Sequence, residues 1–360
     1  TANIPEPDLG PNSTAGNPDQ HFGTMIWSGD GIDTTTARGG LNFKPDVVWW
    51  KNRAAAHQPM FWSQMTPSSG VTGHGPIYFN GTAGVGDWGL QGITGWNADG
   101  VDISGNWNIT NSASGKYVIW AWKAGDKTVT DTTGTLKVQR STNVDAGFSL
   151  ITYNGGGDTA SESIGHGLGK VPAMIISKAT TEGGKWFVKH QSLADNWVMS
   201  IEATDVGQAD ATVFSAGGSP DSSVYYIGTH DNINGEVAQR YVVQVWAEIE
   251  GYSKFASYKG NGNADGPFIY LGFKPAWVMI KNTTNATNGW VQKDIVRSPF
   301  NPMKQTLYPE GASEVADEAQ MDFLSNGIKI RDTDSEVNTS ASIYIYAAFA
   351  EMPFKYATAR

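Results

Sequence analysis

The chain has 360 residues, 39% of them hydrophobic and 17% charged, with a formal net charge of −10 at pH 7 and no cysteine. The apolar fraction is adequate for packed cores, which excludes a disordered chain. The acidic balance argues against a nucleic-acid partner, because such a partner needs a basic stripe. The missing cysteines exclude disulfides, thiolate metal sites and a cysteine nucleophile.

Residues 1–20 carry four prolines among small polar residues. This composition is typical of an extended segment without its own core, so we expect an extended N-terminal arm, either frayed or ordered against a neighbouring subunit. The first residues lack the pattern of a signal peptide, and no run approaches the ~18 apolar residues of a membrane span. With the absence of cysteine, this favours synthesis in a reducing cytoplasm and no membrane insertion.

From about residue 21 onward, three landmarks recur in the same order and at similar spacing. First comes an aromatic residue followed by glycines at the second and fourth places, then a proline that leads an apolar run ending in lysine, then a tyrosine that opens a second apolar run. The aromatic residues are Trp27, Tyr153 and Tyr258, the prolines are Pro45, Pro172 and Pro275, and the tyrosines are Tyr117, Tyr241 and Tyr344. Repetition of scaffold positions indicates architecture, since a catalytic site is normally one unrepeated constellation.

The repeat predicts three units of the usual domain size. We expect a β-sandwich unit over 21–125, a linker or hairpin over 126–146, a second unit over 147–250, a third over 251–354 and a tail over 355–360. The alternating run 135–139 predicts a short strand within the linker.

Many glycines and frequent turn signals indicate short strands, roughly six or seven in each unit. The predicted fold is all-β: three tandem related sandwiches of jelly-roll or lectin-like type, with the N-terminal arm. In the runs that begin at the tyrosines, apolar residues occupy both faces, as in a central strand covered on both sides. We expect Trp122, Trp246 and Phe349 to be core residues. A short helix over 312–321 is the only helical candidate.

The residues show no constellation typical of catalysis. The six histidines are scattered, and neither a HExxH nor a G-x-S-x-G motif is present. We predict that the chain is not an enzyme and holds no cofactor. A polysaccharide-degrading enzyme stays open as the third hypothesis, because a glycosidase takes two carboxylates from anywhere in its fold. The Asn- and Asp-rich turns 261–265 and 332–338 are candidate calcium sites, although they lack the EF-hand spacing.

Three tryptophans of the first unit, Trp88, Trp96 and Trp107, lie in runs rich in glycine, asparagine and aspartate. Such rings stack on the apolar face of a pyranose while polar neighbours bind its hydroxyls, so these three are the candidate glycan-binding residues. The alternative is that the rings close one end of a sandwich or pack against a sister subunit.

Several runs of the chain resemble a domain of unknown function found in tailed-bacteriophage virion proteins, often labelled tail-fibre-like. The resemblance covers His21 to Glu351 and rests on scaffold positions. The runs that carry it include 42–53 (NFKPDVVWWKNR), 117–125 (YVIWAWKAG), 245–255 (VWAEIEGYSKF), 271–275 (LGFKP), 323–327 (FLSNG) and 346–351 (YAAFAE).

The resemblance implies a β-sandwich virion protein made in the host cytoplasm. We expect a fibre subunit or a capsid-surface decoration that acts through contacts with its own copies and with other virion proteins. A homotrimer is the expected oligomer, because it is the usual symmetry of fibres. Lectin-like recognition of host-surface glycans is the alternative function.

Overall fold

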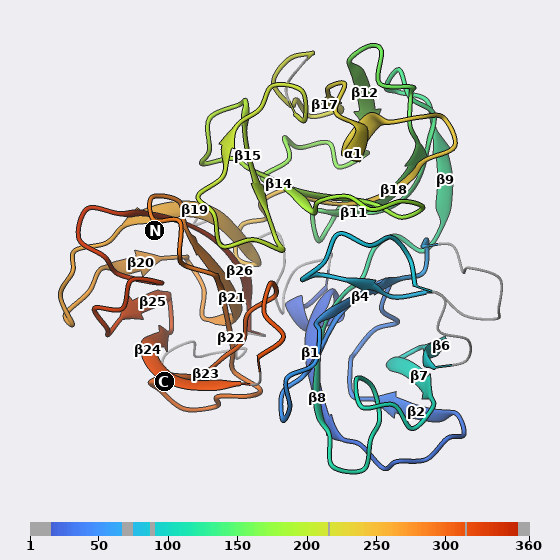
Figure 1. Ribbon diagram of the computed structural model, residues 1–360. Coiled ribbons are helices and arrows are strands. Elements are labelled where there is room, and N and C mark those ends of the chain that lie inside the picture. The colour runs from blue at the N-terminus through green and yellow to red at the C-terminus, as the bar shows by residue number, and fades with distance from the viewer. Residues whose placement is uncertain (1–15, 67–74, 87–90, 215–216, 314, 352–360) are drawn as a thin grey trace, which may run out of the picture.

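The computed structural model describes residues 16–66, 75–86, 91–214, 217–313 and 315–351. The protein is nearly all β, with 43% strand and 2% helix, and its sheets are antiparallel, which confirms the predicted fold class at this level. Helical structure among the described residues is limited to the 3₁₀ turn η1 (Pro18–Gln20) and α1 (Asp231–Asn234). No helix in these ranges is long and apolar enough to cross a membrane. Figure 1 shows the strands gathered into three lobes.

The first segment, residues 22–122, forms the lobe coloured blue to teal in Figure 1. One sheet has the order β1-β8-β3-β4-β5 and another the order β2-β7-β6. The strand bounds are β1 Phe22–Ser28, β2 Thr36–Gly39, β3 Val47–Asn52, β4 Met60–Ser63, β5 Ile77–Tyr78, β6 Gly92–Asn97, β7 Gly100–Ser104 and β8 Lys116–Trp122. Side chains from both sheets, including Trp50 and Ile103, form one buried cluster.

The second segment, residues 148–246, repeats this order as β11-β18-β13-β14-β15-β16, with a smaller sheet β12-β17. The strand bounds are β11 Phe148–Asn154, β12 Glu162–Gly165, β13 Met174–Ala179, β14 Phe187–His190, β15 Trp197–Ser200, β16 Gln208–Ala209, β17 Val224–Ile227 and β18 Arg240–Trp246. Two further strands, β9 (Thr128–Asp131) and β10 (Val138–Asn143), extend the large sheet beyond β11. The expected linker is therefore a hairpin, and its second strand begins at Val138, within the predicted run 135–139, and continues to Asn143.

The third segment, residues 253–350, contains the sheets β19-β26-β21-β22 and β20-β25-β24-β23. The strand bounds are β19 Ser253–Lys259, β20 Phe268–Tyr270, β21 Pro275–Asn282, β22 Trp290–Asp294, β23 Met303–Thr306, β24 Ala316–Leu324, β25 Gly327–Ile330 and β26 Ile343–Ala350. The helix predicted over 312–321 is wrong, because β24 begins at Ala316 and pairs with both β23 and β25. Cross-strand pairing that buries Met321 and Phe323 overrides the local helix propensity.

The three segments thus share one strand order: the opening strand pairs with the closing strand, which pairs with the strand led by the landmark proline. The described residues of each segment form eight strands, more than the six or seven expected. The predicted unit boundaries themselves stay predictions.

Each landmark aromatic residue stacks on the landmark tyrosine of its own segment. Because the opening and closing strands are paired, these two residues face each other across the ladder. The stacked pairs are Trp27 with Tyr117, Tyr153 with Tyr241, and Tyr258 with Tyr344, at centroid distances of 5.4, 5.0 and 4.9 Å. Such cross-strand aromatic pairs stabilise a sheet.

The landmark glycines allow a loop to approach the end of the opening strand. A Cβ at Gly29 would lie 2.0 Å from the Ser112 carbonyl oxygen, and Gly31 has a φ of +68°. In each segment, the connection before the closing strand holds a fully buried asparagine whose side-chain oxygen accepts a backbone N–H of the glycine turn. These residues are Asn111, Asn234 and Asn338. The repeated sequence pattern is therefore a repeated turn closure.

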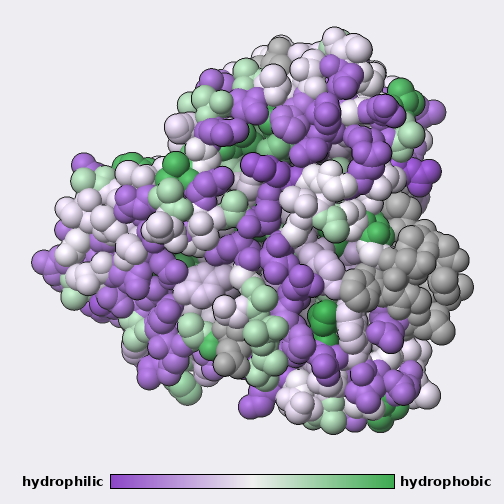
Figure 2. Space-filling model, in the orientation of Figure 1, coloured by the Kyte–Doolittle hydropathy of each residue, from purple (hydrophilic) through white to green (hydrophobic). Residues whose placement is uncertain are grey.

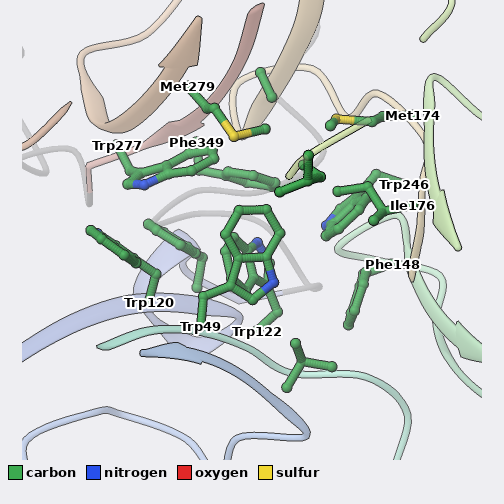
Figure 3. Packing of buried hydrophobic residues seen from close by; sticks show 14 of the residues in the cluster. Trp49, Trp120, Trp122, Phe148, Met174, Ile176, Trp246, Trp277, Met279 and Phe349 are labelled. Carbon is green, nitrogen blue, oxygen red and sulfur yellow. The ribbon is translucent and has the colours of Figure 1, made fainter. Parts of the chain in front are cut away.

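The largest buried apolar cluster lies where the three lobes meet. The closing strand β8 directs Val118, Trp120 and Trp122 into this shared cluster and Tyr117, Ile119 and Ala121 into the core of its own segment. Trp122 lies 6.0 Å from Trp246 and 5.8 Å from Phe349 between ring centroids. Figure 3 shows these rings converging from all three segments. Trp122, Trp246 and Phe349 are buried as predicted, and together they lie in one core that the three segments share.

Candidate functional site at the seams between segments

The penultimate residue of the proline-led strand is a buried lysine in each segment: Lys51, Lys178 and Lys281, each at most 1% exposed. The Lys178 ammonium donates to the Gly184 carbonyl of its own hairpin at 2.8 Å and to the Thr82 carbonyl of the first segment at 2.9 Å. In the same way Lys281 donates to Asn288 and, at 2.9 Å, to Thr204 of the second segment. Each of these two lysines therefore joins two segments.

Lys51 completes the set. It donates to the His57 carbonyl of its own hairpin and to the Gly311 and Ala312 carbonyls of the third segment, at 3.2 and 2.8 Å. The lysine of the second segment thus donates to the first segment, the lysine of the third to the second, and the lysine of the first to the third. The lysine contacts form a closed cycle, which restrains all three segments at once.

Carbonyl dipoles hold these ammonium groups. Because burial disfavours the charged form, the pKa of Lys51 falls to about 7, and those of Lys178 and Lys281 fall to about 8. The sequence displayed the lysine three times at the end of a strongly apolar strand, which was the signal that a buried role existed. Its partners are loops distant in sequence, so their identity needed the fold.

Two tryptophan indoles make a second set of contacts across the seams. Trp186 Nε1 donates to the Tyr78 carbonyl of the first segment at 2.7 Å, and Trp290 Nε1 donates to the Ser200 carbonyl of the second segment at 2.9 Å. The backbone N–H of Trp290 donates to Glu310 at 3.1 Å. Burial raises the pKa of Glu310 to about 7.

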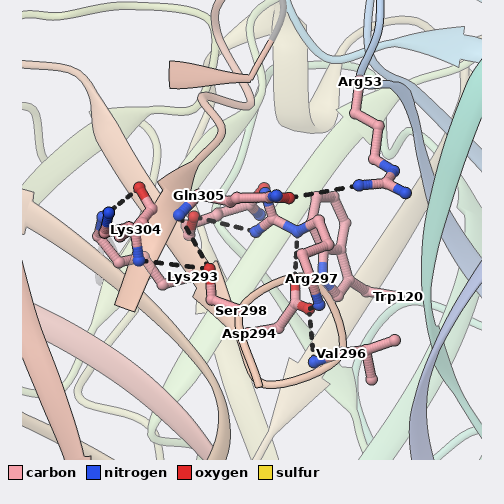
Figure 4. Close-up of polar contacts among 10 residues, drawn as sticks. Arg53, Trp120, Lys293, Asp294, Val296, Arg297, Ser298, Lys304 and Gln305 are labelled. Atoms are coloured by element: carbon pink, nitrogen blue, oxygen red, sulfur yellow. Dashed lines mark hydrogen bonds and ion pairs between the residues drawn. The ribbon is translucent and has the colours of Figure 1, made fainter. Parts of the chain in front are cut away.

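The seam between the first and third segments also carries an unrepeated polar cluster (Figure 4). Asp294 is fully buried and pairs with the equally buried Arg297. Asp294 also accepts the indole N–H of Trp120 at 3.0 Å, while the Arg297 guanidinium lies over the Trp120 ring at 5.3 Å. Arg53 Nη1 donates to Gln305 Oε1 at 3.3 Å.

A groove of about 390 Å³ lies beside this cluster, lined by residues 297–302, 304–305 and 315–317. Its rim includes Phe300, whose side chain is 82% exposed, the largest exposure among the large hydrophobic residues of the described chain. Figure 2 shows hydrophobic residues scattered over the visible face of the molecule. Aromatic residues are enriched at protein interfaces relative to the rest of the surface.

The tryptophans predicted to bind glycans belong to the first segment. Trp96 lies in β6, Trp107 lies in the loop after β7, and both are partly buried against the core of the first segment. Trp88 lies outside the described residues. The structure brings Trp96 and Trp107 to the same core, and their role in glycan binding stays a prediction.

The two candidate calcium turns meet through Asn338, whose side chain donates to the Asn263 and Asp332 carbonyls at 2.7 and 2.8 Å. Within the described ranges, no group of three or more histidine, aspartate and glutamate side chains is placed to hold a metal ion. These turns are connected by hydrogen bonds between their own residues.

Comparison with known protein families gives a match over nearly the whole chain. The family described as "Domain of unknown function (DUF7483)" matches residues 17–353. The chain therefore belongs to this family. No curated protein matches the chain.

Proposed function

Taking the chain as a member of this family, we propose that it is a structural protein of a tailed-bacteriophage particle, either a fibre subunit or a capsid-surface decoration. It acts through contacts with its own copies, as a homotrimer, and with other virion proteins. We further infer that its body consists of three tandem β-sandwich units. The sequence runs that resemble tail-fibre-like virion proteins support the assignment to a particle.

The observation that carries the proposal is the closed cycle of lysine contacts. Lys51, Lys178 and Lys281 have pKa values lowered into the range where an amine can act as a base, yet each is engaged with carbonyls of two segments. These groups serve architecture. Together with the shared aromatic core, they give a body that transmits force between its segments, as a projecting virion protein requires.

The groove beside Phe300 is the contact surface that we assign to assembly. Its rim combines the exposed Phe300 with Pro299 and Pro302, while Lys304 and Asp317 supply one charge of each sign. This composition resembles the centre and rim of a protein interface. Aromatic anchors of this kind carry much of the binding energy at such contacts.

Immunogold electron microscopy of intact particles tests the proposal, with antibody raised against this chain. Label on the tail end supports a fibre, and label over the capsid supports decoration. Particles without label, from a preparation in which the chain is expressed, would refute the structural role.

A variant pair tests the contact surface. Phe300→Ala is expected to lower incorporation into particles at least tenfold, while its melting temperature stays unchanged because the side chain is exposed. Tyr270→Ala is the matched control, since Tyr270 is also a strongly exposed aromatic residue, at 66%. Equal incorporation of both variants would remove the groove from the proposal.

A further inference from the structure

A cleft of about 490 Å³ with a mixed polar and apolar lining lies on the face of the large sheet of the second segment. Its walls include Lys137, Gln139, Thr152, Asn154 and Arg240, together with Met65 of the first segment. The first and third segments have no counterpart of β9 and β10 in their described residues, so this wall breaks the threefold repetition.

Strand register places the polar side chains on one face. Gln139 pairs with Thr152 across β10 and β11, and Asn154 pairs with Arg240 across β11 and β18. Lys137 directly precedes β10 and lines the same cleft as Gln139. Lys137 lies at the start of β10 and Arg240 is the first residue of β18, and β11 lies between these two strands, which are therefore about 10 Å apart across the sheet. Two cations therefore flank a strip of amide and hydroxyl groups.

The cationic groups are free to bind a ligand. Arg240 is the one arginine in the described ranges whose guanidinium has neither an ion pair nor a hydrogen bond, because the other five are engaged through their side chains. Lys137 likewise has no ion pair within the part of the chain that the structure describes. Both side chains are exposed. Two unpaired cations therefore lie at one cleft of a chain whose net charge is −10.

We propose that this cleft binds an anionic saccharide, with Arg240 and Lys137 contacting a carboxylate or phosphate and with Gln139, Thr152 and Asn154 contacting hydroxyls. The volume is within the range of small-ligand sites. An arginine fork matches the geometry of carboxylate and phosphate groups, and amides supply both donors and acceptors to sugar hydroxyls. The inference does not depend on the proposed virion role.

The repeat supplies a control for the test. Lys116, Arg240 and Ile343 are the first residues of the three closing strands and so occupy equivalent positions. Lys116 is also an exposed cation, but no added hairpin stands beside it. Lys116→Ala therefore removes the same charge from the same strand position outside the cleft.

Isothermal titration calorimetry with the full chain tests the proposal, using trigalacturonic acid as the carboxylate probe, glucose 1-phosphate as the phosphate probe and maltotriose as the neutral probe. We expect at least one acidic probe to bind tenfold more tightly than maltotriose. Arg240→Ala and Lys137→Ala each weaken that binding at least fivefold, while Lys116→Ala leaves it unchanged. The acidic probe that binds identifies the anionic group.

Three results would overturn the proposal. The first is that the acidic probes bind no more tightly than maltotriose at 10 mM. The second is that Lys116→Ala weakens binding as much as Arg240→Ala. The third is tighter binding of a tetraglutamate peptide than of either acidic sugar, which would assign the cleft to an acidic protein segment. Circular dichroism of each variant establishes that it is folded.

Discussion

Replacing Trp186 by phenylalanine tests the contacts between segments most directly. The substitution keeps an aromatic ring in place but removes the indole N–H that donates to the Tyr78 carbonyl at 2.7 Å. Trp122→Phe and Trp277→Phe are matched controls, because both rings are equally buried in the same cluster while their Nε1 atoms have no hydrogen-bond partner.

The three substitutions remove the same atoms from buried positions, so the free-energy cost of the lost packing has the same origin in all three variants. Trp186→Phe also leaves the partly buried Tyr78 carbonyl without this donor, which costs about 1–3 kcal/mol. Trp122→Phe and Trp277→Phe instead remove an unpaired N–H and escape that cost. For a chain of 360 residues, the difference corresponds to a decrease in melting temperature of about 1–4 °C.

Urea unfolding followed by circular dichroism measures the free energies, and calorimetry measures the melting temperatures. Trp186→Phe is expected to be the least stable of the three. Trp290→Phe, which loses the bond to Ser200, should behave in the same way. If either control variant loses as much stability as Trp186→Phe, the indole contacts do not contribute as argued.

Three further predictions follow from the same contacts. Asp294→Ala should cost about 3–5 kcal/mol, because it leaves Arg297 charged and buried, whereas Asp322→Ala, which breaks an exposed pair with Arg331, should cost below about 1 kcal/mol in urea titrations. The free energy of unfolding of the wild type relative to Lys178→Met should be lowest below pH 8 and rise toward pH 10.5, because over that range folded Lys178 loses its proton while the unfolded lysine keeps it. A difference in urea-derived free energy that does not change with pH would contradict this. Calorimetry should show one unfolding transition, and three separate transitions would contradict a shared core.

The repeat in the sequence was enough to predict an all-β chain and to locate the residues that build it. Trp27 and Tyr117 were visible as landmarks because each segment needs the same stacked pair. The glycines were visible because a Cβ at Gly29 would collide with the facing loop. Such local requirements leave a mark at fixed spacing. The helix predicted over 312–321 failed because pairing between strands, which a local pattern does not encode, decides the state of that run.

For the candidate sites too, the sequence showed some of the residues, while their partners became known only from the fold. Lys178 was visible as a repeated residue, but its acceptor at Thr82 lies in another segment and no spacing rule connects them. The cleft at Arg240 depends on the added strands β9 and β10 docking beside β11, an arrangement that requires the whole sheet.

The sequence by itself determined the fold class and the repeated scaffold, because alternating burial and turn closure are set by near neighbours along the chain. Only the tertiary structure decided that Trp122, Trp246 and Phe349 meet in one core and that the three buried lysines connect the segments in a cycle. Contacts between distant residues depend on how the segments pack, and that packing is a property of the folded chain as a whole.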